Sequence, residues 1–338
     1  MAIPTRVKRR LTLTILVGVS ALAVAACGSS SSSSSTSSSP STSAGAPSNA
    51  SSSGGKSTKL SVGFIPIAGA APVIVGEQDG DFAKQHLTIS LDTLSTPSEG
   101  VANVLSGRDQ IGFINPGGIA QAAEANLPIQ VIAPLYFAGT DQGIYAKAGG
   151  PIKTVADLKG KTVALGSLKS NSQAAVMYQI QAAGVDPNSV KYVLLPIAQT
   201  AAAVEAGKVD AAYVAEPFIT QAGSKLQPII KAPFAGLGSP APAAYAFVSK
   251  KWAQQNPDLL TQFKTALAAA ETKATTDPTA ARNAIGTYTE IPKPLLAKMT
   301  LPGFGTNPAI GPLNQQLQQM VKYGFIPKLP DTQALFGQ

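Results

Sequence analysis

Residues 102–113 read ANVLSGRDQIGF and residues 202–213 read AAVEAGKVDAAY, and this pair of segments indicates the fold. Each begins as a short helix, passes through a glycine (Gly107 or Gly207), turns at an aspartate and ends in a strand. Each strand then enters a loop that contains proline. The echo predicts two similar lobes that share one cleft, because open α/β sheets bind ligands at the carboxyl ends of their strands. The alternative is a chance likeness between two common turns.

Strand and helix patterns alternate on both sides of these segments. Strands are expected at residues 60–65, 87–94, 110–114 and 130–137, then at 143–147, 162–165, 190–194 and 210–214. Helical patterns separate most of them, so the sequence predicts an α/β fold with mostly parallel sheets. A strand over residues 243–249 is expected to return to the first lobe, and helices dominate from Trp252 onward.

The N-terminal segment has the parts of a secretory signal peptide: basic residues at 6–10, apolar residues at 11–24 and small residues before Cys27. The apolar part is shorter than the roughly 20 residues that a membrane-spanning helix needs. Residues 22–28, LAVAACG, resemble the lipobox of bacterial lipoproteins, whose cysteine carries the lipid. We therefore predict a signal peptide over residues 1–26 and a lipid anchor at Cys27, which is the only cysteine. The alternative is an ordinary signal peptide with an incidental cysteine.

A serine-rich segment follows the predicted anchor. Residues 27–58 hold too few apolar side chains to bury a core, so we expect a disordered tether with a reach of roughly 30 Å. Together the anchor and tether predict a protein held at the extracytoplasmic face of the cell membrane.

Charge and composition exclude several classes of function. About half of the net charge of +8 comes from Arg6, Lys8, Arg9 and Arg10, and no run of basic residues follows, so we expect no nucleic-acid binding. One cysteine and one histidine cannot build an internal disulfide or a typical zinc site, and they leave little room for histidine-based acid–base catalysis. We therefore predict no metal, no cofactor and no catalytic residues.

Several motifs carry a resemblance to a known family: VGFIP (62–66), GDF (80–82), VLSGRDQIG (104–112), IKTVADLKGKTVA (152–164) and AGKVDAAYVAEPF (206–218). In order and spacing they resemble the nitrate/sulfonate/taurine group of ABC-importer solute-binding proteins, which also contains binders of pyrimidine precursors. The resemblance covers about residues 59–325. It implies the two-lobed type 2 periplasmic-binding-protein fold, with a ligand cleft between the lobes and a helical C-terminal region. His86 stands where the family usually has glycine, which indicates a left-handed or solvent-facing position.

On this resemblance we expect lobe 1 in residues 59–140 and 250–338, and lobe 2 in residues 141–249. It implies that loops 66–70, 115–118, 167–172 and 213–216 line the cleft. The residues expected to contact the ligand are Pro66, Ala68, Gly69, Asn115, Pro116, Gly117, Ser167, Lys169, Ser170, Asn171, Ser172, Tyr213 and Glu216.

Physical arguments support two of these loops. Residues 166–172 lie between a strand and a helix, where free N–H groups and the helix dipole favour an anion, although a plain helix cap is the alternative. The two glycines of loop 115–118 allow the backbone to approach a ligand closely, or simply make a tight turn.

The arginines narrow the choice of ligand. Beyond Cys27 only Arg108 and Arg282 are present, and neither lies in the four loops. A bidentate arginine clamp for a carboxylate is therefore missing, which disfavours amino acids. Two ligand classes stay open: an oxyanion such as a sulfonate held by N–H and hydroxyl groups, or a small heterocycle held by Tyr213, Asn115 and Glu216.

The resemblance implies a monomer that closes around a small molecule by a hinge motion and delivers it to the transmembrane permease of an ABC importer. One rival is a binding protein that presents its ligand to a sensory receptor. The other is an enzyme like the related thiamine-pyrimidine synthases. Those enzymes rely on histidine and cysteine, and this chain has only His86 and Cys27, so we predict that it is not an enzyme.

Overall fold

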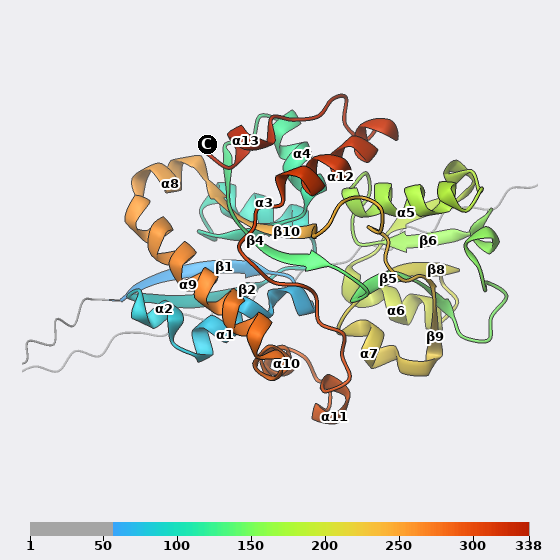
Figure 1. Cartoon of the computed structure of the whole chain (residues 1–338), viewed down its shortest axis with the longest axis horizontal. Coiled ribbons are helices and arrows are strands. Elements are labelled where there is room, and N and C mark those ends of the chain that lie inside the picture. The colour runs from blue at the N-terminus through green and yellow to red at the C-terminus, as the bar shows by residue number, and fades with distance from the viewer. Residues whose placement is uncertain (1–56, 338) are drawn as a thin grey trace, which may run out of the picture. The chain divides into compact units, whose positions relative to one another are not determined.

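A computed structural model of the chain describes residues 57–337. The predicted signal peptide, the predicted anchor Cys27 and residues 27–56 of the predicted tether lie outside the described residues. The described residues all belong to one compact unit, Gly54–Gln338. Figure 1 shows their arrangement as two groups of strands with helices packed around each.

The first group of strands comes from both halves of the chain. Strands β1 (Thr58–Phe64) and β2 (Leu87–Thr93) pair in parallel, with Leu60 opposite Ile89. Strands β3 (Gly112–Ile114), β10 (Ala241–Ser249) and β4 (Ile129–Ala138) form a second sheet in that order, with β10 antiparallel to both neighbours. The predicted return of a strand near residues 243–249 is confirmed, and it makes this sheet antiparallel.

The second group is one five-stranded sheet. Its order is β7 (Lys191–Leu194), β6 (Thr162–Leu165), β8 (Ala211–Ala215), β5 (Gln142–Lys147) and β9 (Leu226–Ile230). Strand β6 runs parallel to β7 and β8, whereas β5 runs antiparallel to β8 and β9. The expectation of mostly parallel sheets is therefore wrong: strands joined by helices run parallel, but β5 and β10 enter their sheets through loops and run antiparallel to both of their neighbours.

Helices cover both groups. Those that follow the first strands are α1 (Ala71–Gln78), α2 (Asp81–Lys84), α3 (Pro97–Ser106) and α4 (Pro116–Glu124). The five-stranded sheet carries α5 (Asn171–Ala182), α6 (Ile197–Glu205) and α7 (Phe218–Ala222). The C-terminal part holds α8 (Lys250–Gln255), α9 (Pro257–Thr276), α10 (Pro278–Thr287), α11 (Lys293–Leu296), α12 (Ile310–Lys322) and α13 (Thr332–Leu335). Short 3₁₀ turns span Ala68–Ala70, Val155–Leu158, Pro187–Ser189 and Gly223–Lys225.

The two similar segments, residues 102–113 and 202–213, form similar structures in the two groups of strands. Gly107 ends α3 with φ 82°, and Gly207, just past α6, has φ 70°, so both occupy the left-handed conformation that favours glycine. The aspartate that follows each glycine fixes the turn to the neighbouring strand. Ser61 Oγ donates to Asp109 Oδ1 at 2.6 Å, and the Thr162 N–H donates to Asp210 Oδ2 at 2.8 Å.

The start of helix α4 differs from the expected pattern, and the conformation of His86 matches it. Helix α4 begins at Pro116, inside the segment expected to be a loop, because Asn115 Oδ1 caps it by accepting from the Gly118 N–H at 2.7 Å. His86 is exposed and has φ 57°, which confirms the expected left-handed, solvent-facing position.

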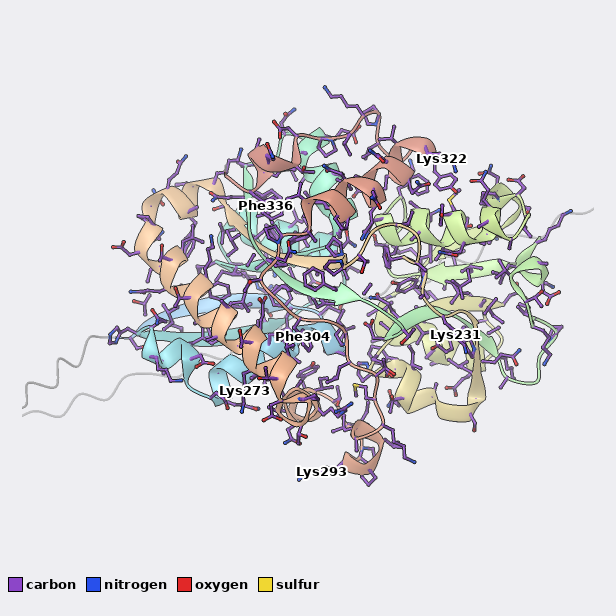
Figure 2. All side chains as sticks on the ribbon, in the orientation of Figure 1. Lys231, Lys273, Lys293, Phe304, Lys322 and Phe336 are labelled. Atoms are coloured by element: carbon purple, nitrogen blue, oxygen red, sulfur yellow. The ribbon has the colours of Figure 1, made fainter. Side chains whose placement is uncertain are left out.

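The C-terminal helices bind the two groups of strands to each other. At the end of α12, Lys322 Nζ donates to Gln181 Oε1 of α5 at 2.7 Å, and Figure 2 shows Lys322 beside that helix. Farther along, Phe336 packs edge-on against Tyr245 of β10 with ring centroids 5.4 Å apart. The C-terminal segment is thus part of the folded core.

Candidate functional site

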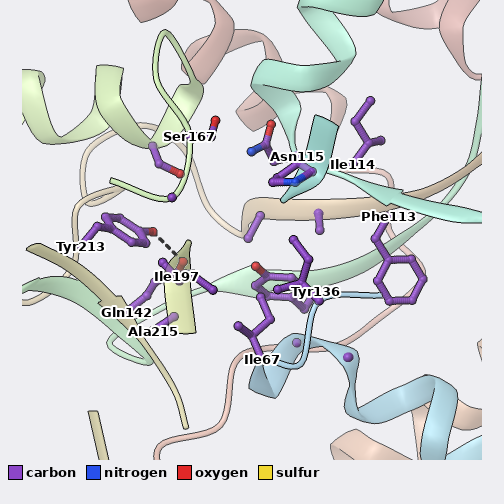
Figure 3. A pocket seen from close by; sticks show the side chains of 18 of the residues that line it. Ile67, Phe113, Ile114, Asn115, Tyr136, Gln142, Ser167, Ile197, Tyr213 and Ala215 are labelled. Carbon is purple, nitrogen blue, oxygen red and sulfur yellow. Dashed lines mark hydrogen bonds between the residues drawn. The ribbon is translucent and has the colours of Figure 1, made fainter. Parts of the chain in front are cut away.

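A cavity of about 110 Å³ lies where strands from both groups end (Figure 3). Ile65 follows β1, Ser95 lies just past β2 and Asn115 follows β3. From the five-stranded sheet, Gly166 follows β6 and Ala215 is the last residue of β8. Five strands therefore present their carboxyl ends to one cavity, which is where ligands bind in open α/β sheets.

One wall of the cavity is built around Tyr136 on β4. Gly69, in the turn that precedes α1, lies so close to the Tyr136 ring that a Cβ atom at Gly69 would overlap it. Glycine at this position therefore allows the ring to approach the turn closely. Other lining residues of the same wall are Ile67, Ala70, Pro97, Phe113, Ile114, Ala243 and Ala244.

The opposite wall centres on Tyr213 of β8, which is buried. Its hydroxyl donates to Gln142 Oε1 on β5 at 2.5 Å, the bond drawn as a dashed line in Figure 3. The amide nitrogen of Gln142 is buried and has no hydrogen-bond partner within residues 57–337. Other lining residues of this wall are Ser167, Ser172, Ile197 and Phe234.

The structure brings together part of the predicted contact set. The predicted residues that line the cavity are Gly69, Asn115, Ser167, Ser172 and Tyr213. The predicted residues that are not among its lining residues are Pro66, Ala68, Pro116, Gly117, Lys169, Ser170, Asn171 and Glu216. Ligand contact remains a prediction for every residue of the set.

Several residues of the second subset have structural partners instead. Ser170 Oγ caps α5 by accepting from the Gln173 N–H at 3.2 Å. Lys169 is exposed, with φ 50°, and its carbonyl accepts from Gln121 Nε2 at 2.8 Å. These contacts shape the turn before α5 and leave Ser167 and Ser172 on the cavity side.

Asn171 joins the starts of two helices. Its Oδ1 accepts from the Gly117 N–H of α4 at 3.2 Å, and its Nδ2 donates to Gln316 Oε1 of α12 at 2.9 Å. A Cβ at Gly117 would lie 2.7 Å from the backbone nitrogen of Asn171, so α4 and α5 meet here at backbone distance.

Glu216 lies at the edge of the cavity region, just after Ala215. Its carbonyl accepts from the Ala68 N–H at 2.9 Å, and its carboxylate accepts from Thr220 N–H and Oγ1, both at 2.9 Å. Burial raises the pKa of Glu216 above its ordinary value. This residue therefore connects the turn before α1 to the end of β8.

A second buried acid, Asp141, precedes Gln142. Burial raises its pKa to about 6, even though its Oδ1 accepts from the Gly139 N–H at 2.7 Å. The pKa of Tyr213 is also raised, first by burial and then by the nearby Tyr136 and Asp141. Tyr213 is thus a neutral hydrogen-bonding group at ordinary pH.

Most residues of the cavity wall were not predicted from the sequence. Ile65, Ile67, Phe113, Ile197 and Phe234 are apolar residues at the ends of strands or in loops, and their residue type resembles ordinary core. The first three lie at or just past the carboxyl ends of the strands predicted at residues 60–65 and 110–114, and that position is the signal that would have found them. Tyr136 and Gln142 lie inside strands, where no motif marks them.

Within residues 57–337, no three His, Cys, Asp or Glu side chains come together in a way that would hold a metal ion. In the same range, none of the helices has the length and apolar character needed to cross a bilayer.

Comparison with known proteins gives a consistent family. The family model described as NMT1/THI5 like matches residues 68–281. The taurine-binding periplasmic protein of Escherichia coli (strain K12) is 28% identical over 151 residues, which are 44% of this chain and 46% of that protein. The chain spans about half the length of the curated relatives it matches.

Solved structures share the fold at low sequence identity. The nitrate-binding protein NrtA from Synechocystis PCC 6803 matches with a TM-score of 0.71 and 17% identity, covering 83% of this chain and 86% of that one. The alkanesulfonate-binding protein SsuA from Xanthomonas axonopodis pv. citri, bound to MOPS, matches with a TM-score of 0.68 and 17% identity, covering 82% and 97%. The predicted fold class, the two-lobed α/β fold of periplasmic binding proteins, is thereby confirmed.

Proposed function

The chain belongs to the NMT1/THI5-like family, and on that premise we propose that it is an extracytoplasmic solute-binding protein. It captures a small molecule in the cavity between its lobes and delivers it to the transmembrane permease of an ABC importer. The single observation that carries the proposal is the cavity itself, to which five strands from three separate sheets present their carboxyl ends.

The division into lobes gives the mechanism its moving parts. We keep lobe 2 as residues 141–249 and lobe 1 as the rest of the body, except that β10 joins lobe 1 because it pairs with β3 and β4. Two chain segments then connect the lobes, residues 139–141 and residues 231–240. Capture is hinge bending at these segments, and a ligand that touches both walls favours the closed form.

Contacts between the lobes hold the closed form. The Ala68 N–H donates to the Glu216 carbonyl at 2.9 Å, and the Gly117 N–H donates to Asn171 Oδ1 at 3.2 Å. Both bonds join turns at helix starts that face each other across the cavity region. Release of the ligand at the permease requires these bonds to break.

The ligands named for the relatives suggest the first compounds to test, a taurine- or sulfonate-like oxyanion or nitrate, and the sequence analysis adds a small heterocycle. The proposed contacts within the predicted set are Gly69, Asn115, Ser167, Ser172 and Tyr213, because these line the cavity. A lipid on Cys27 would hold the protein at the outer face of the membrane, near the permease, as a monomer.

We propose binding without turnover. The only histidine, His86, is exposed and is not among the residues that line the cavity. A sensory role, in which the closed protein docks on a receptor instead of a permease, would use the same cavity and the same hinge.

A thermal-shift screen of the full-length protein in detergent tests this proposal. The probes are taurine, ethanesulfonate, nitrate, uracil and a set of neutral small molecules, each recovered afterwards and analysed by mass spectrometry. A ligand at 100 times its Kd stabilises the folded state by about 2.7 kcal/mol, so Tm rises. A rise in Tm with the compound unchanged, together with stimulation of the ATPase of the co-expressed permease, supports the proposal. Conversion of the compound into a product would overturn it, and so would no stabilisation by any probe.

A further inference from the structure

The walls of the cavity are mainly hydrocarbon. The large side chains that line it are Ile65, Ile67, Ile114, Phe113, Ile197 and Phe234. Ala70, Ala215, Ala243 and Ala244 fill the spaces between them. A ligand in this cavity therefore gains most of its binding free energy by burying apolar surface.

The polar groups of the lining are neutral, and several are already engaged. Asn115 Oδ1 accepts from the Gly118 N–H at 2.7 Å, and Tyr213 donates its hydroxyl hydrogen to Gln142 at 2.5 Å. Among the described residues that line the cavity, none is lysine, arginine, histidine, aspartate or glutamate. A charged ligand would find no counter-charge in the wall.

An anion would also face unfavourable surroundings. The strongest favourable group is the start of α5, where Ser170 already caps the Gln173 N–H. A helix N-terminus offsets only part of the free energy lost when an anion leaves water. Behind the walls lie the carboxyl groups of Asp141 and Glu216, next in sequence to the lining residues Gln142 and Ala215. When they ionise, their charges repel an anion.

The same charges attract a cation as weakly as they repel an anion, because they act from behind the wall. Asp141 and Glu216 do not line the cavity, and their oxygens accept from the Gly139 N–H and from Thr220. Both carboxyl groups are therefore directed toward the protein's own donors, and an ammonium in the cavity would be desolvated without an ion-pair partner.

The size of the cavity limits the ligand further. An apolar cavity of about 150 Å³ holds benzene; this cavity is smaller, at about 110 Å³, but it is partly open, so one small ring is the most that it encloses and a substituent can extend through the opening. The lining also holds the hydroxyl groups of Ser95 and Ser167, which can donate a hydrogen bond to the ligand. A single acceptor on the ligand, such as a carbonyl oxygen or a ring nitrogen, matches such a donor.

We infer that the ligand is an uncharged, largely apolar molecule of about one small ring that carries one hydrogen-bond acceptor. This inference rests on the proposed function and specifies its ligand. It separates this chain from relatives named for taurine, nitrate or sulfonates, although the fold is shared.

Three molecules of nearly identical shape and different charge test the inference: benzamide (neutral), benzoate (anionic) and benzamidinium (cationic). Titration calorimetry with the full-length protein in detergent at pH 7.5 gives their Kd values, with ethanesulfonate as a further anion. We expect benzamide to bind at least tenfold more tightly than each charged molecule.

A charge introduced into the wall provides the matched variant. Ile197→Lys places an ammonium group at the cavity, and we expect it to tighten benzoate binding at least tenfold and to weaken benzamidinium binding. Leu194→Lys, three residues earlier on exposed β7, adds the same charge outside the lining and should leave the order of affinities unchanged.

The outcomes separate the inference from the proposed function. Preference of the wild type for benzoate or ethanesulfonate, or no binding of benzamide, would overturn the inference and leave a solute-binding role intact. Tight benzamide binding that never stimulates a permease ATPase would overturn the proposed import function and leave the ligand class standing. An unchanged preference in Ile197→Lys would show that the wall does not set charge selectivity.

Discussion

Asn171 and Gln316 are separated by 145 residues in sequence, yet Asn171 Nδ2 donates to Gln316 Oε1 at 2.9 Å. The bond is buried and belongs to a chain of three. Asn171 Oδ1 accepts from the Gly117 N–H at 3.2 Å, and Gln316 Nε2 donates to the Pro242 carbonyl at 3.0 Å. The chain joins the start of α5 to α4, to α12 and to β10 next to the cavity.

Asn171→Ala should destabilise the protein markedly. The substitution leaves the Gly117 N–H and Gln316 Oε1 buried without partners, and each unsatisfied group costs about 1–3 kcal/mol. We expect a loss of about 2–4 kcal/mol in the free energy of unfolding, measured by urea denaturation. Gln318→Ala, on the exposed face of α12, is the matched control and should change it by less than about 0.5 kcal/mol. Equal effects of the two variants would show that the buried chain of bonds contributes nothing specific.

The sequence predicts the framework of this fold well, because the framework rests on local signals. Gly107 and Gly207 end or follow helices in the left-handed conformation, where most side chains are strained, so their residue type reveals their position. Asp109 and Asp210 repeat one hydrogen-bonding arrangement in the two lobes. Such features are short-range and depend on one or two residues.

The cavity was predictable only in part, for a physical reason. The polar segment 166–172, which ends in the first turn of α5, was identified from its serines, and it does contribute Ser167 and Ser172. Asn171, from the same segment, instead bonds to Gln316, which no local pattern can reveal because the partner lies 145 residues away. The apolar wall residues were missed because an isoleucine gains the same free energy per unit of buried area against a ligand as in a core. Its residue type therefore does not distinguish the two positions.

Cys27→Ser should abolish lipidation. The sulfur of Cys27 is the predicted attachment atom, and the chain has only one cysteine. Cells grown with radiolabelled palmitate should give labelled wild-type protein in the membrane fraction and unlabelled variant protein. Ser29→Ala changes a nearby residue and should keep the label. A labelled Cys27→Ser variant would show that the lipid is attached elsewhere.

The buried carboxyl group of Glu271 should make the free energy of unfolding depend on pH. It is buried in α9, and burial raises its pKa from 4.5 to about 9. The folded state therefore binds a proton that the unfolded state releases at lower pH. Stability from this group is complete below about pH 4.5 and is lost as pH rises toward about 9, at up to about 1.4 kcal/mol per pH unit.

Glu271→Gln removes the ionisation and should flatten this part of the profile. Urea unfolding between pH 5 and 9 should show the variant losing less stability than the wild type as pH rises. Glu290→Gln removes a charge from an exposed position and serves as the control, with a profile parallel to the wild type. Parallel profiles for Glu271→Gln and the wild type would mean that Glu271 is already ionised in the folded state.

Gly69→Ala should disturb the cavity through its contact with Tyr136. The added Cβ would overlap the Tyr136 ring, so the ring must move, and overpacking of this kind costs about 1–3 kcal/mol. In a Tyr136→Leu background the same substitution should cost at least about 1 kcal/mol less, because the obstructing ring is gone. Gly311→Ala is the matched control: Gly311 lies in α12 with open space around its Cβ position, so alanine there should stabilise the helix by about 0.5–1 kcal/mol. Additive effects of Gly69→Ala and Tyr136→Leu would show that the turn before α1 does not support the ring.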